Sequence, residues 1–145
     1  MWDDWWGFKM ESFDGIPENA ALLERVGARV IMHSDSPDGI QRLNQEAAKA
    51  IAYGRRAGLD IPPERAIRWL TSNPAKSIGV LDRTGTLEPG KMGDVVVWNG
   101  NPFSVYALAD FVFIDGTVRY DRLSPAASPQ SDFTLGQPAA TGVYP

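Results

Sequence analysis

The sequence contains no cysteine and a single histidine, and both shortages limit the sites that it can build. Without cysteine there are no disulfides and no thiolate metal sites, and the composition does not indicate whether the protein's compartment is oxidising or reducing. A histidine-built metal site normally needs two or three imidazoles, whereas this chain has only His33. Any such site is therefore expected to be incomplete within this chain.

Long apolar runs and a strong charge of either sign are also missing. No stretch approaches the ~20 apolar residues of a transmembrane helix, and residues 1–6 lack the basic and then apolar pattern of a signal peptide. The net charge of −4 offers no basic surface to nucleic acid or to an anionic membrane. We therefore expect neither as a partner. A cytoplasmic location is favoured, with export of a longer parent protein left open.

What the chain does have is enough apolar residues for one ordinary domain, and a start that is rich in tryptophan. It has 145 residues, of which 43% are hydrophobic. Trp2, Trp5 and Trp6 have the i, i+3, i+4 spacing of one helix face. Clustered aromatic side chains of this kind mark a packing surface that needs a partner. We expect a homo-oligomer, or association through this N-terminus.

The first half of the chain has the pattern of an α/β unit. A helix is predicted over residues 17–26, and the apolar residues 29–33 predict a buried strand. A loop follows at residues 34–39, in which Asp38 is a good N-cap for a helix that stops at Gly58. The predicted apolar face of that helix consists of Ile40, Leu43, Ala47, Ile51 and Ala52.

The second half changes from helices to short strands. Helices are predicted near Pro63 and from Asn73 to Gly79. Residues 88–91 have the proline and glycine of a type II turn. Strands are predicted at residues 94–98, 111–114 and 117–120, with a tight turn at residues 115–116 between the last two. Residues 123–145, rich in Pro, Ala, Ser and Gly, are predicted to be a loosely ordered tail.

Four segments, in this order, resemble the C-terminal part of the amidohydrolase superfamily. They are residues 27–36 (GARVIMHSDS), 71–76 (TSNPAK), 85–94 (GTLEPGKMGD) and 115–116 (DG). Each segment alone is a weak signal, whereas four in order at plausible spacing are a strong one. The branch with the most similar pattern contains imidazolonepropionase-like and prolidase-like hydrolases.

The resemblance implies a fold of the α/β class. Residues 1–80 would be the C-terminal portion of a (β/α)₈ TIM barrel, comprising its last strand and flanking helices. Residues 81–122 would supply part of a small β-sandwich outside the barrel, and residues 123–145 the tail. The other strands of that sandwich would come before the barrel.

The resemblance also implies a metal-dependent hydrolase of carbon–nitrogen bonds. One or two divalent metals, zinc above all, would activate water against a small amide, lactam or dipeptide-like substrate. Asp35 matches the aspartate at the end of the last strand, which binds metal and shuttles the proton from water to the leaving group. His33 shares the parity of Asp35 on an extended strand, so it is a candidate for substrate contact. A turn or capping role for Asp35, and a structural role for His33, are the alternatives.

The chain also departs from the family pattern. The His-x-His of the first strand, the bridging lysine or carboxylate and the two later histidines are absent, and a barrel needs ~250 residues. Asp35 alone cannot hold a catalytic zinc, which usually takes three protein ligands. The isolated chain is therefore expected to be inactive. The alternative is a non-catalytic remnant that folds by self-association or by complementing a separate barrel chain.

One motif points elsewhere and is set aside. Gly85 to Lys91 matches the first seven positions of a phosphate-binding P-loop, but Met92 stands where Ser or Thr should hold magnesium. Pro89 also removes an amide that would face phosphate, and a strand is predicted where the P-loop needs a helix. We expect a turn here instead of a nucleotide site, and Lys91 as a surface charge.

Overall fold

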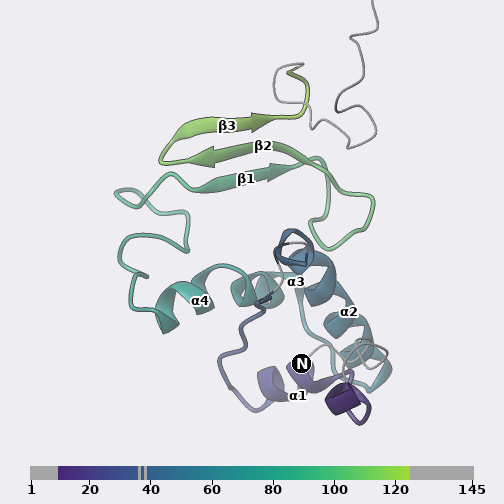
Figure 1. Ribbon diagram of the computed structural model, residues 1–145. Coiled ribbons are helices and arrows are strands. Elements are labelled where there is room, and N and C mark those ends of the chain that lie inside the picture. Colours follow the sequence, from purple (N-terminus) through teal and green to yellow (C-terminus); the bar gives the residue numbers. More distant parts are fainter. Residues whose placement is uncertain (1–9, 36, 38, 125–145) are drawn as a thin grey trace, which may run out of the picture.

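The chain forms a layer of helices and a separate small sheet (Figure 1). The computed structural model describes residues 10–35, 37 and 39–124. The tryptophan-rich start, the expected cap at Asp38 and the tail beyond residue 124 lie outside these residues. The elements are the 3₁₀ turns η2 (Met10–Ser12), η3 (Ile40–Arg42) and η4 (Ile67–Trp69), the helices α1 (Asn19–Arg25), α2 (Leu43–Arg56), α3 (Pro63–Ala66) and α4 (Ser72–Ser77), and the strands β1 (Val95–Trp98), β2 (Ala109–Ile114) and β3 (Thr117–Asp121).

The hydrophobic core lies among the helices. Trp69 is fully buried at its centre, and the sheet contributes no strand residue to it among the described residues. No helix in the described ranges is long and apolar enough to cross a membrane. The buried members of the core are Ala21, Val30, Ala47, Ala50, Ile51, Leu59, Ile61, Ala66 and Trp69.

Helix α2 packs on α1 through small residues, and its buried face includes Ala47 and Ile51 of the predicted one. A Cβ atom added at Gly54 would lie 2.5 Å from the Cβ of Ala21, so the two helices approach closely at this glycine. Ala50 is buried as well, whereas the predicted face included Ile40, which is 56% exposed, and Ala52, which is exposed. The prediction of those two positions was wrong because Ile40 lies in the 3₁₀ turn η3 before α2, and Ala52 points away from the face that Ala47, Ile51 and Gly54 share.

Residues 29–33, predicted to be a buried strand, run extended without pairing to another strand. Val30 is buried and its two following neighbours are half-buried, whereas Arg29 and His33 are exposed, so the prediction of a buried strand was wrong at both ends of the run as well. The Val30 carbonyl accepts a hydrogen bond from Asn73 Nδ2 at 2.8 Å, and the Met32 N–H donates to the Trp69 carbonyl at 3.1 Å. A strand needs a neighbouring strand for its ladder, and the described residues place none beside this segment. The barrel therefore remains a prediction.

A buried carboxylate joins α1 to α3 and η4. Glu24 is only 8% exposed, and it accepts hydrogen bonds from Arg65 Nε at 2.8 Å and from the Trp69 indole N–H at 3.0 Å. Buried charges are tolerated when they are paired and hydrogen-bonded, as this one is. The cluster thereby fixes the tryptophan at the centre of the core.

The β unit follows the predicted turns. Gly90 has a φ of +91°, and the Lys91 N–H donates to the Glu88 carbonyl at 3.2 Å, as a type II turn requires. The three strands form an antiparallel sheet in the order β1-β2-β3. Asp115 and Gly116 both have positive φ, the conformation of a two-residue hairpin turn. These turn and hairpin predictions are confirmed.

Asp94 ties the start of the β unit to its hairpin. One carboxylate oxygen accepts from the Asp115 N–H at 3.0 Å, and the other accepts from the Thr84 hydroxyl at 3.3 Å. Gly93 lies so close to this turn that an added Cβ would be 2.6 Å from the Gly116 nitrogen. The Gly-Asp pair that ends the third motif is thus a structural link.

Gly85 joins the β unit to the helical layer. Its φ is +94°, and a Cβ added there would lie 2.5 Å from the Cβ of Ala75 in α4 and 3.2 Å from the Thr71 carbonyl oxygen. The loop before β1 therefore presses its backbone against α4. The first glycine of the third motif is explained by this contact and needs no phosphate ligand.

Replacing Glu24 with alanine should lower the free energy of unfolding by about 2–4 kcal/mol, because it leaves the Trp69 indole N–H without its buried acceptor. Urea denaturation followed by tryptophan fluorescence measures the change. Glu64→Ala, at an exposed carboxylate of α3, is the matched control and should cost much less. Equal losses in the two variants would contradict the role of the cluster.

Replacing Gly85 with alanine should destabilise the chain by about 1–3 kcal/mol, since it combines a left-handed backbone with overpacking against α4. Gly100→Ala serves as the control, because a Cβ at Gly100 meets nothing within 4 Å. Thermal melts of both variants would report the difference. A Gly85→Ala melt that matches that of Gly100→Ala would show that the loop does not press on α4.

Candidate functional site

The two residues predicted for the site lie next to each other at the end of the extended segment. His33 Nδ1 is 3.8 Å from Asp35 Oδ1, and the two side chains are 77% and 94% exposed. Asp35 lies at a bend, and its approach to His33 is consistent with the shared side that the i, i+2 spacing predicts for extended backbone. The chain thus presents an imidazole and a carboxylate together, open to solvent, beyond the point where the core holds Val30.

His33 borders a shallow cavity of about 250 Å³ between α1, the extended segment and α2. Ala20, Leu23 and Met32 give it apolar walls, and Glu46 and Lys49 lie on its α2 side. The Lys49 ammonium is 2.8 Å from Glu46 Oε1, so these two charges neutralise each other. Asp35 does not line this cavity, so its carboxylate lies outside it.

A divalent metal fits this pair of residues only in part. An imidazole nitrogen and a carboxylate oxygen are suitable ligands for zinc, which usually takes three protein ligands in catalytic sites. Within the described residues, however, no three His, Asp or Glu side chains come together in a group that could hold a metal ion. His33 and Asp35 could supply part of a metal site, and the remaining ligands would have to come from elsewhere.

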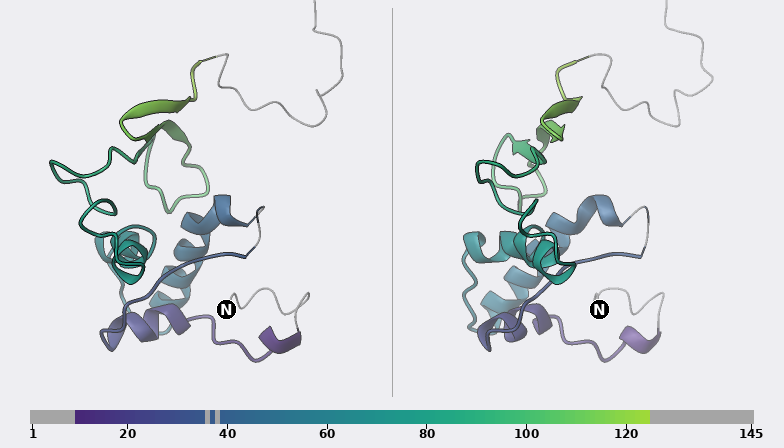
Figure 2. Two further views of the ribbon diagram at one scale, coloured as in Figure 1. Left: turned by 60° about the vertical axis from the view of Figure 1, so that its left-hand side comes forward. Right: turned by 90° about the vertical axis from the view of Figure 1, so that its left-hand side faces the viewer.

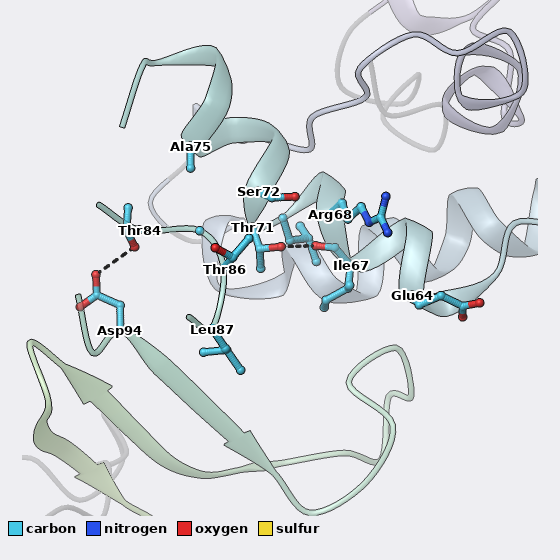
Figure 3. Close-up of a pocket in the computed structure, with 12 residues that line it drawn as sticks. Glu64, Ile67, Arg68, Thr71, Ser72, Ala75, Thr84, Thr86, Leu87 and Asp94 are labelled. Atoms are coloured by element: carbon cyan, nitrogen blue, oxygen red, sulfur yellow. Dashed lines mark hydrogen bonds between the residues drawn. The ribbon is translucent and has the colours of Figure 1, made fainter. Parts of the chain in front are cut away.

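A cavity of about 650 Å³ lies between the α3–α4 region and the loop before β1 (Figure 3). Several of its polar side chains already bond within the protein. The Thr71 hydroxyl donates to the Ile67 carbonyl at 2.9 Å, and the Thr84 hydroxyl donates to Asp94. The cavity includes neither His33 nor Asp35, and we assign it to the gap between the helical layer and the β unit.

Lys91, expected to be a surface charge, has a side chain that is only 13% exposed. Its ammonium donates to the Thr86 hydroxyl at 2.5 Å and lies 3.5 Å from Glu88 Oε2. A hydrogen bond with the Thr86 side chain, and then the charge of Lys91, lower the pKa of the Glu88 carboxyl. The expectation of a free surface charge was wrong because the turn folds the lysine back on its own loop. A lysine held in this way is not the phosphate ligand of a P-loop.

The supports of the site escaped the sequence reasoning. Asn73 and Trp69 hold the segment that carries His33 and Asp35, through bonds to Val30 and Met32. The one available signal was the Asn-Pro-Ala motif, whose asparagine matched the family without a stated contact. The bond joins residues 43 positions apart, which no local pattern reveals.

The chain is similar to amidohydrolases in sequence and in structure. The sequence model of the Amidohydrolase family matches residues 14–122. Amidohydrolase tasK of Hapsidospora irregularis is 34% identical over 115 residues, which are 79% of this chain and 11% of that protein. The imidazolonepropionase of Mesorhizobium japonicum is 30% identical over 78 residues, which are 54% of this chain and 19% of that protein.

A solved structure shows the same relationship. The crystal structure of an amidohydrolase from Thermotoga maritima MSB8 is 35% identical, with a TM-score of 0.68. The matched part is 79% of this chain and 29% of that one, so this chain spans less than a third of that relative's length. The family match from residue 14 to residue 122 covers most of the chain, and the chain therefore belongs to the amidohydrolase family.

Proposed function

We propose that this chain is the C-terminal part of a metal-dependent amidohydrolase, with Asp35 as a metal ligand and proton shuttle. The observation that carries the proposal is the position of Asp35. It lies beside His33 at the open end of an extended segment whose other end is held in the core. The segment belongs to the motif that matches the last barrel strand of the family.

The chemistry follows from what a carboxylate at this position can do. A divalent metal, when bound, supplies positive charge that lowers the pKa of water and polarises the bond under attack. Asp35 would accept a proton from the attacking water and pass it to the departing nitrogen, since an amine leaves more readily once protonated. His33, 3.8 Å away, would contact the substrate from the same side.

The proposed substrates are small molecules with a carbon–nitrogen bond of the amide, lactam or dipeptide-like kind. The relatives named amidohydrolase and imidazolonepropionase support this class. In a barrel enzyme the loops after several strands select the substrate, and the described residues include one such loop, after Asp35. The choice within the class would therefore be made by other loops of the complete enzyme.

A chimera tests the proposal. Residues 14–122 would replace the matching C-terminal part of the Thermotoga maritima amidohydrolase, and its zinc content and turnover of a panel of amides, lactams and dipeptides would be measured. Asp35→Asn should lower kcat/KM by roughly 10²–10⁴-fold, the range for losing a general base, and should also reduce bound zinc. Turnover by the isolated chain should be undetectable, since its described residues bring two candidate ligands together at this site, where zinc usually needs three.

Asp60→Asn is the matched control, because Asp60 is an exposed carboxylate far along the chain from the proposed site, with an 82% exposed side chain. It should leave zinc content and turnover unchanged. If Asp35→Asn behaves as Asp60→Asn does in an active chimera, the catalytic role of Asp35 is wrong. Metal-dependent turnover by the isolated chain would contradict the ligand count.

We propose as a second candidate that the chain acts as a non-catalytic remnant that self-associates, and the sheet is the observation in its favour. Val96 and Val97 are adjacent in β1, so their side chains point to opposite faces, yet they are 45% and 41% exposed. Ile114 and Val118 are exposed to a similar degree. Strands β1 and β3 are both edges, because only β2 has two partners within the described sheet. Apolar faces and open edges favour association.

Self-association would appear as a mass above 15.9 kDa that rises with concentration, measured by size-exclusion chromatography with light scattering. Val97→Lys should restore the monomer, because a lysine on an edge strand opposes pairing with another chain. Val105→Lys, at a 65% exposed valine outside the strands, is the control and should leave the mass unchanged. A wild-type monomer with a cooperative melt would count against the remnant.

A further inference from the structure

We propose that Asn73 is a positioning residue for Asp35. Its side-chain amide bonds to the extended segment where a neighbouring strand would otherwise do so. The amide thereby fixes the direction of the backbone that carries Asp35. The catalytic meaning of this arrangement rests on the function proposed for Asp35. The positioning itself does not, and it can be measured separately.

Two hydrogen bonds hold the segment along one edge. Asn73 Nδ2 donates to the Val30 carbonyl at 2.8 Å, and the Met32 N–H donates to the Trp69 carbonyl at 3.1 Å. Polar groups of an extended chain alternate between its two edges, so residues two apart present theirs on the same edge. One bond from a side chain and one from a backbone thus replace two rungs of a strand ladder.

Both partners come from one short stretch of chain that the core immobilises. Trp69 is fully buried, and its indole N–H is held by Glu24. Asn73 follows in the first turn of α4, where Ala75 is buried and packs against the β unit. Figure 2 shows the extended segment running from α1 past the helices before the chain enters α2. The segment is therefore positioned by a rigid neighbour.

The position of Asp35 depends on the course of the extended segment, because few other contacts of the described residues restrain its side chain. Its side chain is 94% exposed and approaches His33, which is itself 77% exposed. It lies three residues beyond Met32, where the second of the two bonds is made. A rotation or slip of the segment at Val30 would therefore carry through to the carboxylate. Catalytic groups lose much of their effect when displaced by about 1 Å.

The test uses the whole 145-residue chain, labelled with ¹⁵N, and measures hydrogen exchange of the Met32 amide and the ¹⁵N shift of Asp35. Asn73→Ala should lower the protection of Met32 about tenfold or more and move the Asp35 shift. Asn44→Ala is the matched control, because Asn44 Nδ2 also donates to a distant carbonyl, that of Pro102, at 2.6 Å. It should leave both readouts at their wild-type values.

Asn73→Asp gives a pH profile that a general loss of stability would not produce. Its carboxylate keeps the shape of the amide but has no proton to donate, so Met32 protection should fall near neutral pH. As the pH drops below about 4, the usual range for a carboxyl pKa, the protonated form can donate to Val30 again. Protection relative to the wild type at the same pH should then recover.

Unchanged Met32 protection and an unchanged Asp35 shift in Asn73→Ala would overturn the proposal. So would unfolding of both Asn73 variants while Asn44→Ala stays folded, since the amide would then support the whole core and not the segment. Asp35→Asn should leave Met32 protection as it is in the wild type. The positioning result therefore stands or falls independently of whether Asp35 binds metal.

Discussion

The helical layer depends on a carboxylate that the fold has taken out of water. Glu24 accepts hydrogen bonds from Arg65 and from the Trp69 indole, and so joins α1 to the α3–η4 turn across 41 and 45 positions of sequence. An unpaired charge at this depth would be costly, so the three groups hold one another in place. Arg65 is half exposed, so solvent weakens the stabilisation that its ion pair with Glu24 contributes. The hydrogen bond from the buried Trp69 indole to Glu24 contributes the larger part of the stabilisation.

That cluster also determines how the candidate site is built. Trp69 and Asn73 lie on one stretch of chain, and each holds one polar group of the extended segment. The segment therefore has a fixed base in the core and an open end, at which His33 and Asp35 meet. A rigid support beneath exposed groups is the arrangement that the role proposed for Asp35 requires, because its neighbours can then define its position.

The β unit has a different kind of order. Much of its order is local, from the glycine turns, the Asp94 bridge and the antiparallel ladder, and its backbone approaches α4 closely at Gly85. Both faces of the sheet carry exposed valines. Such a surface suits further strands or a second chain.

The sequence by itself determined the elements whose causes are local. Gly90, Asp115 and Gly116 predict their turns because few residues adopt positive φ, and the four family motifs identify the amidohydrolase relationship. The helices near residues 17–26 and 63–79 and the three strands also follow from caps and patterns.

Tertiary structure decided what depends on distant partners. The apolar run at residues 29–33 has the composition of a strand, but a ladder needs a neighbour, and its place is taken by Asn73 and Trp69. The buried face of α2 was set by the close approach of α1 at Gly54, and Lys91 was drawn out of solvent by its own turn. Burial and hydrogen bonding between residues some forty positions apart depend on three-dimensional packing, which no local pattern encodes.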